Sequence, residues 1–233
     1  MTSPVVSNFE TFLGSWSNRQ ETLQHQLLSS ISPQNVENTQ HHQDLISQVL
    51  SHYEHYYEEK TIAARDDVFV FLHPPWLSSF ERTLTWLGEF KPSVIFRIIT
   101  NSLTDLTPEQ SERIQQLKIE TRIQERALTE AMARIQESLA APPILGLTRR
   151  SARLIDGEVS DMEVAVEALK AAMLTVLESA DALRGSVVIG LVEILSPVQA
   201  VRFLAAALEF QIQMRAWGRR SDAQRFAASN GLL

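Results

Sequence analysis

The chain contains no cysteine and few of the residues that interrupt helices. Its 233 residues include 8 glycines and 9 prolines, which fall mainly where helices are expected to end. Without cysteine there are no disulfides, no thiolate chemistry and no cysteine-based zinc site. The shortage of glycine and proline favours helices over a turn-rich β fold.

A secretory signal and a membrane span are also missing. The N-terminal segment MTSPVVSNFE has neither the charged nor the apolar region of a secretory signal, and no apolar run approaches the length of a membrane span. We therefore expect a protein of the nucleus, the cytoplasm or both, with no membrane partner.

Positive charge is not concentrated on this chain, whose formal net charge is -7. Domains that bind nucleic acid are usually basic or carry one strongly basic face. The densest basic groups here are only Arg149, Arg150 and Arg153, then Arg219 and Arg220. Direct nucleic-acid binding by this chain is therefore not expected. The first arginine group is more simply a solvated loop than a contact for an acidic partner.

Start signals for helices recur along the chain. Ser7–Glu10, Ser78–Glu81 and Ser160–Glu163 have the S-x-x-E spacing of a capping box. Thr107–Gln110 and Ser196–Gln199 have glutamine at the third position and add a proline at the first helical position. These signals place the beginnings of five helices.

Apolar residues repeat at helical spacing along the chain, and no convincing strand pattern is present. In the N-terminal half we expect a first helix from residue 7, helices over about 40–60, 66–72 and 76–87, and another beginning at residue 92. In the C-terminal half we expect helices over about 108–140, 160–183, 185–195 and 197–217. The helix over 108–140 would be about 50 Å long, the length of a central spine.

The sequence thus predicts an all-α fold, a multi-helix bundle of roughly seven or eight helices with one long central helix. We expect one helical domain over residues 8–218, with an internal linker over residues 141–157 where prolines and glycines gather. Gly218 is expected to stop the last helix. Because residues 219–233 lack periodicity, they are expected to be a disordered tail.

The most informative segment is WLSSFERTLTWLGEFKP, residues 76–92, which follows a pair of prolines. The prolines break the preceding helix, and apolar residues then recur at helical spacing up to Leu87. Gly88 stands where a left-handed residue would end a helix. The segment predicts a tightly packed helix over residues 76–87, and it holds no catalytic chemistry.

Catalytic and phosphate-binding motifs are absent from the sequence. There is no G-x-S-x-G elbow, no Walker loop and no G-x-G-x-x-G, and the last histidine is His73. Paired carboxylates such as Asp66 and Asp67 are explained more simply as solvated helix ends. We therefore expect no enzymatic activity, no catalytic residue and no cofactor.

Histidines crowd into one third of the chain, and two of them have metal-like spacing. His52, His55 and Glu59 form a His-x-x-His-x-x-x-Glu set that could share one helix face. No H-E-x-x-H is present, and no Glu-x-x-His pair of the kind used twice in carboxylate-bridged bundles. We favour exposed or half-buried histidines on a tyrosine-bearing helix, and we expect no metal site.

Aromatic residues are the candidates for a binding site. Tyr53, Tyr57, Trp76 and Trp86 could line a cleft for an apolar ligand or a partner helix. The favoured alternative is ordinary core, where aromatic rings bury large areas.

The adjacent residues Glu81 and Arg82 are also candidates. Neighbours in a helix point in different directions, so these two are not expected to pair with each other. A structural role bridging to neighbouring helices is favoured over partner recognition.

These residues together resemble the delay-of-germination domain of plants, which also forms the C-terminal half of TGA-type bZIP transcription factors. The resemblance extends from Phe9 to about Trp217, and three blocks carry it in order. The blocks are HYEHYYEEK ending at Lys60; Trp76 with Glu81, Arg82, Trp86, Gly88 and Pro92; and Gln110, Leu117, Glu125, Leu128, Gln136 and Ser138-Leu139-Ala140. Because no basic region or leucine zipper precedes them, we expect a stand-alone delay-of-germination-like protein.

The resemblance implies a regulatory protein without catalysis, linked to seed maturation, dormancy and abscisic-acid signalling. Some members of the family bind type 2C protein phosphatases, which makes this class the expected partner. Glu89 departs from the family pattern, because many relatives have a second glycine there. Haem binding through C-terminal histidines is linked to the family, but no histidine follows His73 here, so haem is not carried over.

Two alternative functions stay open at this point. The protein would otherwise be a transcription co-regulator acting with TGA-type bZIP factors, or a sensor of a small apolar ligand or haem. Apolar stripes broad enough for a core are also compatible with a homo-oligomer.

Overall fold

The described part of the chain is helical almost throughout, as its few glycines and prolines predict. A computed structural model describes residues 4–32, 38–140 and 156–230, and these form eight α-helices, one 3-10 helix and one two-stranded hairpin. The elements are α1 (Pro4–Ser30), α2 (Thr39–Asp66), α3 (Val68–Leu72), α4 (Ser79–Leu84), β1 (Thr85–Trp86), β2 (Glu89–Phe90), η1 (Pro92–Val94), α5 (Ile95–Ser102), α6 (Pro108–Ser138), α8 (Asp156–Ile194) and α9 (Pro197–Asn230). The predicted all-α class is confirmed. Within the described ranges, no helix is both long enough and apolar enough to cross a membrane.

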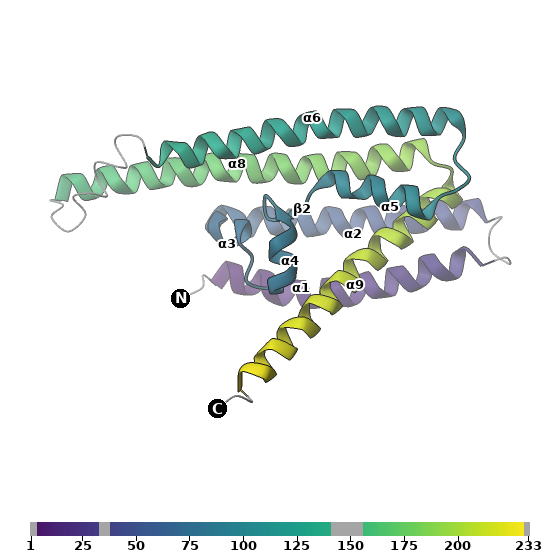
Figure 1. Cartoon of the computed structure of the whole chain (residues 1–233), viewed down its shortest axis with the longest axis horizontal. Helices are drawn as coiled ribbons and strands as arrows, with labels where there is room; N and C mark the ends of the chain where they lie inside the picture. The colour runs from purple at the N-terminus through teal and green to yellow at the C-terminus, as the bar shows by residue number, and fades with distance from the viewer. Residues whose placement is uncertain (1–3, 33–37, 141–155, 231–233) are drawn as a thin grey trace.

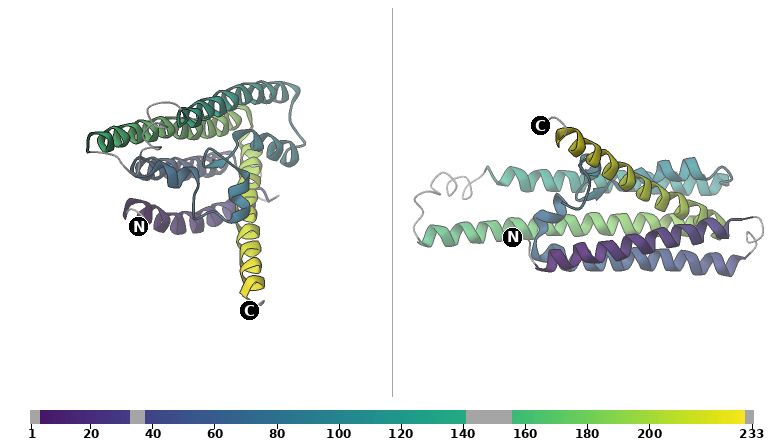
Figure 2. Two further views of the ribbon diagram at one scale, coloured as in Figure 1. Left: turned by 60° about the vertical axis from the view of Figure 1, so that its left-hand side comes forward. Right: turned by 90° about the horizontal axis from the view of Figure 1, so that it is seen from below.

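Two long helix pairs form the body of the molecule. α1 lies beside α2, and α6 lies beside α8, with the two helices of each pair antiparallel (Figure 1). α9 crosses α1 and α2 obliquely, and the short helices α4 and α5 pack against it. The views in Figure 2 show the C-terminal end of α9 projecting away from both pairs.

Apolar side chains from these helices fill two cores. The larger core joins α1, α2, α5, α8 and α9, and its buried residues include Leu23, Leu45, Phe96, Leu191 and Phe203. The smaller core joins the start of α1 to α3, α6 and α8, and its buried residues include Phe9, Phe71, Met132 and Leu177. Each core is built from segments distant in sequence, so the helices derive most of their stability from packing on one another.

Three of the predicted helix starts are confirmed by their hydrogen bonds. Ser78 Oγ accepts from the backbone N–H of Glu81 at 3.2 Å, and Glu81 Oε2 accepts from the N–H of Ser78 at 2.9 Å. Thr107 and Gln110 form the same reciprocal pair at the start of α6. The third pair opens α9 at residues 196–199. Local capping signals therefore locate these ends correctly.

Other helix ends differ from the prediction. α1 begins at Pro4 and α8 begins at Asp156, so the predicted starts at residues 7 and 160 are wrong. α8 also continues through Gly185 to Ile194, where two separate helices were expected. A glycine inside a helix costs only about 1 kcal/mol relative to alanine, which packing against α6 outweighs.

The capping signal at Ser78 is correct, but the predicted range of residues 76–87 is too long at both ends. α4 is shorter, and Thr85 and Trp86 then pair with Phe90 and Glu89 in an antiparallel hairpin. Gly88 does have the expected left-handed backbone, with φ of 83°, but it lies in the hairpin turn. A Cβ at Gly88 would lie 2.5 Å from the carbonyl oxygen of Phe71, so this close approach requires glycine.

α9 continues past Gly218 and ends at Asn230. The predicted stop at Gly218 is therefore wrong, and so is the predicted disorder over residues 219–230. The helix is held here by α4. The rings of Phe80 and Trp217 meet edge to face at 4.2 Å, and Asp222 Oδ2 accepts from the N–H of Ser79 at 2.8 Å. Most of the predicted linker, residues 141–155, lies outside the described residues.

Gly218 lets α9 approach the start of α4, so replacing it tests this contact. A Cβ at Gly218 would lie 2.0 Å from Ser78 Oγ and 2.8 Å from Ser78 Cβ. We expect Gly218→Ala to lower the free energy of unfolding by about 1–3 kcal/mol. Chemical denaturation measures the change.

Gly185→Ala is the matched control. Nothing lies within 4 Å of a Cβ at Gly185, which is also inside a long helix. This variant is expected to be more stable by about 0.5–1 kcal/mol. A Gly218→Ala protein as stable as Gly185→Ala would contradict the close contact between α4 and α9.

Candidate functional site

Three distant segments of the chain meet at four charged side chains. Lys60 lies near the end of α2, Glu89 on β2, and Asp181 and Arg184 one turn apart on α8. The exposed fractions of Lys60, Asp181 and Arg184 are 2%, 8% and 7%. We call these four residues the charged cluster.

Lys60 lies between the two carboxylates of the charged cluster. Its Nζ is 2.5 Å from Glu89 Oε1 and 2.8 Å from Asp181 Oδ1. Arg184 Nη1 donates to the same Asp181 oxygen at 2.6 Å. Two positive and two negative charges therefore balance, as buried charges must.

The Arg184 side chain also holds the hairpin by donating hydrogen bonds to backbone carbonyls of the hairpin. Its Nε donates to the carbonyl oxygen of Phe90 at 3.0 Å, and its Nη2 donates to the carbonyls of Trp86 at 2.5 Å and Leu87 at 3.1 Å. The guanidinium carbon also lies 5.5 Å from the centre of the Trp86 ring. One side chain of α8 thus fixes both strands and the turn between them.

The pKa values of the two carboxyls move in opposite directions. Burial disfavours ionised Glu89, but the charges of Lys60 and Arg184 outweigh it and lower the pKa of Glu89. Burial raises the pKa of Asp181, and the nearby charge of Glu89 raises it further against the effect of Lys60. Glu89 is therefore the better stabilised anion of the pair.

The tyrosine run on α2 surrounds the charged cluster. Tyr56 OH donates to Glu89 Oε1 at 2.8 Å, and Lys60 Nζ lies 5.8 Å from the centre of the Tyr57 ring. Burial raises the pKa of Tyr56 and Tyr57 well above the ordinary value, and the Glu89 carboxylate adds to this effect. Both phenols are therefore neutral in the physiological range, and Tyr56 is the one that donates to Glu89.

The structure does not bring all six predicted binding residues together: Tyr53, Tyr57, Trp76 and Glu81 line one large cavity, whereas Arg82 and Trp86 do not. Tyr57 and Trp86 lie at the charged cluster. Tyr53 belongs to a second polar group, where its OH donates to Gln211 and accepts from Gln20 at 3.2 Å. This group joins α2 to α9 and α1, and burial raises the pKa of Tyr53.

Of the other three predicted residues, Trp76 lies between α3 and α4, and Glu81 and Arg82 lie on α4. Trp76 packs its ring against Phe9 at 5.3 Å and Phe71 at 5.1 Å. Glu81 closes the capping box of α4, while Arg82 Nη1 donates to the carbonyl of Leu77 at 2.8 Å. Glu81 and Arg82 thus bond to different groups within the α4 segment.

His52 and His55 have different neighbours. The His52 ring stacks on Trp16 with centres 4.7 Å apart, and Trp16 Nε1 donates to the carbonyl of His52 at 3.1 Å. His55 instead meets Phe12 edge to face at 5.1 Å. Burial, aided by the charge of Arg19, lowers the pKa of His52 to about 4. In residues 4–32, 38–140 and 156–230, no group of three or more potential metal ligands gathers.

A large cavity borders the charged cluster. Its volume is about 1470 Å³, and it reaches between α1, α2, the hairpin, α8 and α9. Tyr57, Glu89, Asp181 and Arg184 line it together with apolar side chains such as Phe210. Several polar groups of the lining bond to other helices or to the hairpin: Tyr53 to Gln211, Glu89 to Tyr56, and Arg184 to the Phe90 carbonyl. These contacts are suited to holding the helices together.

The sequence analysis missed three members of the charged cluster as site residues. Glu89 appeared only as a departure from the family pattern, and Asp181 and Arg184 were not singled out. A signal was present, because Asp181 and Arg184 are charged residues three apart on the apolar face of a helix. Their partner Lys60 lies 121 residues away in sequence from Asp181, which no local pattern reveals.

The fold and the charged cluster define an all-α protein whose buried polar groups serve to join helices. A family model described as "Seed dormancy control" (DOG1) matches residues 21–101. The chain is 38% identical over 223 residues to Protein ZW2 of Arabidopsis thaliana, covering 92% of this chain and 99% of that protein. It is 39% identical over 215 residues to Protein RESPONSE TO ABA AND SALT 1 of the same plant, covering 89% of this chain and 94% of that protein. The chain belongs to the delay-of-germination family.

Transcription factors share the same domain. The chain is 31% identical over 173 residues to Transcription factor TGA5 of Arabidopsis thaliana. This match covers 74% of the chain but 52% of that protein. The relationship to both regulatory groups, predicted from the three sequence blocks, is confirmed.

Lys60→Met tests whether the charged cluster stabilises the fold. Methionine keeps much of the volume but leaves the Glu89 and Asp181 carboxylates without their shared cation. We expect the free energy of unfolding to fall by about 3–5 kcal/mol, measured by chemical denaturation. The control is Arg65→Met, which removes an ion pair to Glu178 from a side chain that is 66% exposed. The control is expected to cost less than about 1 kcal/mol, and equal losses in the two variants would contradict a structural role for the cluster.

His52→Phe tests the buried histidine. Because the folded-state pKa of about 4 is below the ordinary 6.5, the contribution of His52 to stability is complete above pH 6.5 and is lost as the pH falls towards 4. The wild type should therefore lose about 3 kcal/mol more than His52→Phe between pH 7 and pH 4. Denaturation at each pH measures this difference. Parallel pH profiles for wild type and His52→Phe would disprove the assignment.

Proposed function

We propose that this protein is a non-enzymatic regulator that acts by binding protein partners in abscisic-acid responses of seed maturation and dormancy. The observation that carries the proposal is the 39% identity to Protein RESPONSE TO ABA AND SALT 1, along 94% of that protein. Type 2C protein phosphatases are the proposed partner class. The protein acts in the nucleus, the cytoplasm or both.

The contacts of the buried polar groups support a binding role. Lys60 and Arg184 direct their hydrogen bonds to carboxylates and hairpin carbonyls, and Tyr56 directs its OH to Glu89. These groups have structural partners, so they are poor candidates for a general acid, a general base or a nucleophile. A rigid helical scaffold that presents a fixed surface is the simplest use of this arrangement.

Transcription co-regulation with TGA-type bZIP factors is the second candidate. It is favoured by the match to Transcription factor TGA5, in which the shared domain makes up about half of the protein. A protein with the same domain could act in the same nuclear assemblies. A sensor of a small apolar ligand is a third candidate, supported by the cavity of about 1470 Å³.

Affinity capture from maturing seed tissue separates these functions. The full-length tagged protein serves as bait, and captured proteins are identified by mass spectrometry. We expect type 2C phosphatases, and each one recovered is then purified and titrated with the purified protein to establish direct binding. Recovery of TGA-type factors without phosphatases would replace the first proposal with the second. A lipid or tetrapyrrole released from the purified protein in native mass spectrometry would support the third.

A further inference from the structure

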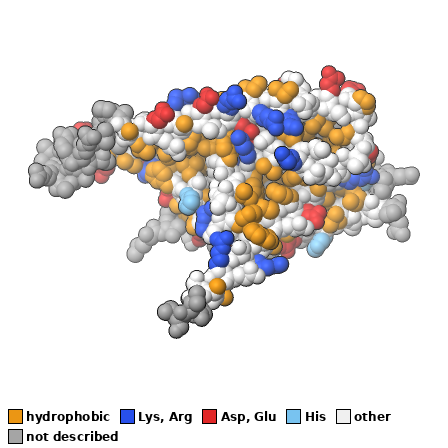
Figure 3. All heavy atoms as spheres, viewed as in Figure 1, with side chains coloured by type: hydrophobic (Ala, Val, Ile, Leu, Met, Phe, Trp, Pro, Cys, Tyr) orange, Lys and Arg blue, Asp and Glu red, His pale blue; other side chains and the backbone are white. Residues whose placement is uncertain are grey.

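An apolar patch lies on the face formed by α4, the hairpin and α9. We define it by six residues that are exposed or half-buried: Phe80 and Leu84 one turn apart on α4, Phe90 on β2, and Phe210, Met214 and Trp217 at helical spacing on α9. The Phe80 and Trp217 rings meet at 4.2 Å, and the Phe90 and Phe210 rings meet at 5.5 Å. Leu84 is 42% exposed and Trp217 is 51% exposed, although both have large apolar side chains. In Figure 3, hydrophobic side chains gather at the centre of this face, over α9 and the elements beside it.

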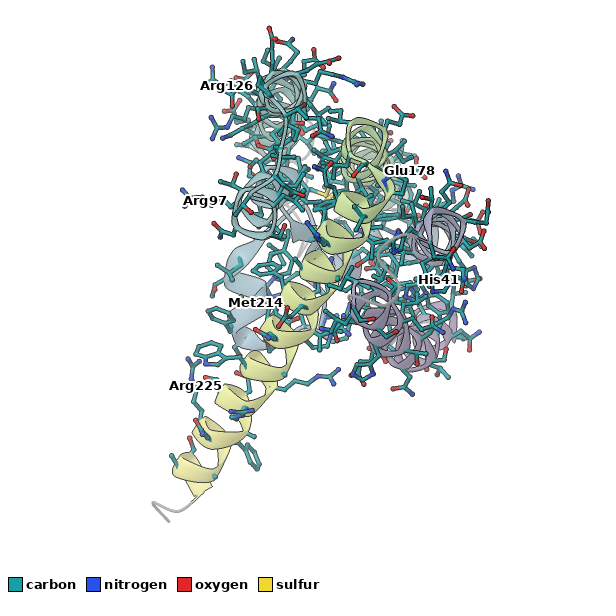
Figure 4. The ribbon with its side chains drawn as sticks, turned by 90° about the vertical axis from the view of Figure 1, so that its right-hand side faces the viewer. His41, Arg97, Arg126, Glu178, Met214 and Arg225 are labelled. Atoms are coloured by element: carbon teal, nitrogen blue, oxygen red, sulfur yellow. The ribbon has the colours of Figure 1, made fainter. Side chains whose placement is uncertain are left out.

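Arginines lie around the apolar patch. Arg82 is on α4, Arg97 on α5 and Arg225 near the end of α9. Figure 4 places Arg97, Met214 and Arg225 on one side of the molecule and the acidic Glu178 on the opposite side. Figure 3 likewise shows more Lys and Arg than Asp and Glu around the apolar centre of this face. The face is therefore basic in a protein whose formal net charge is -7.

The carboxylates close to this face are already engaged in the fold. Glu81 closes the capping box of α4, and Glu89 binds Lys60 and Tyr56. Glu125 accepts from the backbone N–H of Ser93 at 2.6 Å. Asp222 accepts from the N–H of Ser79. Each of these anions satisfies groups inside the protein.

The three arginines, in contrast, have no carboxylate at ion-pair distance within the part of the chain that the structure describes. Arg82 donates to the Leu77 carbonyl and the Ser79 hydroxyl. The charges of Arg82 and Arg225 both help to lower the pKa of Asp222, so these two arginines share one nearby carboxylate without forming an ion pair with it. Unpaired cations around an exposed apolar centre match the arrangement of an interface, where a desolvated apolar core has a polar rim.

We propose that this face docks a partner protein segment that carries bulky apolar side chains flanked by aspartate or glutamate. The apolar side chains cover Leu84 and Trp217, and the acidic ones meet Arg82, Arg97 and Arg225. This inference rests on the proposed function, because it requires a protein partner. It adds the docking surface on this protein and the kind of side chains that the partner segment must carry. No residue of the apolar patch and none of the three arginines belongs to the charged cluster.

Selection of displayed peptides tests the surface directly. The full-length protein is immobilised, and a library of random displayed peptides is selected on it. We expect enrichment of peptides that combine Asp or Glu with Leu, Phe or Trp. Binding of the enriched peptides should weaken as salt is added, because ions screen exposed charges. Enrichment of neutral or basic peptides, or of none, would overturn the proposal.

Two pairs of variants locate the binding site of the enriched peptides. Leu84→Glu should weaken peptide affinity by about tenfold or more, because it places an anion at the apolar centre. Leu28→Glu is the matched control, since Leu28 on α1 has the same exposure of 42% and lies outside the patch. Arg97→Glu should also weaken affinity, whereas Arg113→Glu on α6 should not. Equal affinities in Leu84→Glu and Leu28→Glu, with both variants folded by circular dichroism, would disprove the assignment.

The same variants distinguish docking of a protein segment from binding of nucleic acid or membranes by the arginines. They also distinguish this inference from the proposed function. A wild-type protein that selects no peptide but binds duplex DNA or anionic vesicles, and loses that binding in Arg97→Glu, would overturn docking of a protein segment. If seed extracts yield no partner while acidic peptides bind at Leu84, the surface stands and the proposed phosphatase partner fails. If phosphatase binds Leu84→Glu normally and the peptides do not, the surface stands and serves a second partner.

Discussion

The fold depends on the neutralisation of Lys60, whose ammonium group lies inside the protein with 2% of the residue exposed. A buried cation is stable only when anions surround it, and here they come from β2 and α8. The three segments cannot separate without exposing or unpairing a charge. Arg184 adds bonds from the same cluster to three hairpin carbonyls, which join the short hairpin directly to α8.

The charged cluster also explains why a hairpin forms where sequence periodicity indicates a helix. Residues 85–87 are spaced correctly for another turn of α4, and local propensity alone would continue it. Continuing it would direct the carbonyls of Trp86 and Leu87 along the helix, away from Arg184. The turn at Gly88 instead brings this backbone onto α8 and lies close to the Phe71 carbonyl. Long-range bonding to a buried cation outweighs local preference here.

Sequence reasoning succeeded where the determining contact is local. The capping boxes at Ser78, Thr107 and Ser196 join residues three apart, so a local pattern can locate them. The same spacing at Ser7 and Ser160 lies inside α1 and α8, which begin earlier. Sequence reasoning failed at Gly218, where periodicity cannot show that α4 packs on the glycine and supports the helix beyond it. The tyrosine run and the segment around Trp86, which carry the family resemblance, both contact the charged cluster. Their meeting point on Asp181 and Arg184 follows from tertiary packing, which one sequence does not reveal.

The internal use of carboxylates shapes the outer surface of the molecule. Glu81 caps α4, Glu89 neutralises the buried Lys60, and Glu125 accepts from the backbone N–H of Ser93, so these charges are directed inward. Arg82, Arg97 and Arg225 form no ion pair with any described residue, although Arg82 and Arg225 lie close enough to Asp222 to help lower its pKa, and they keep their charge at the surface. Net charge therefore misleads about this face, because an acidic chain can present a basic surface wherever its anions hold the fold together. The contacts that stabilise α4 and the hairpin are also the ones that make this face selective for acidic partners.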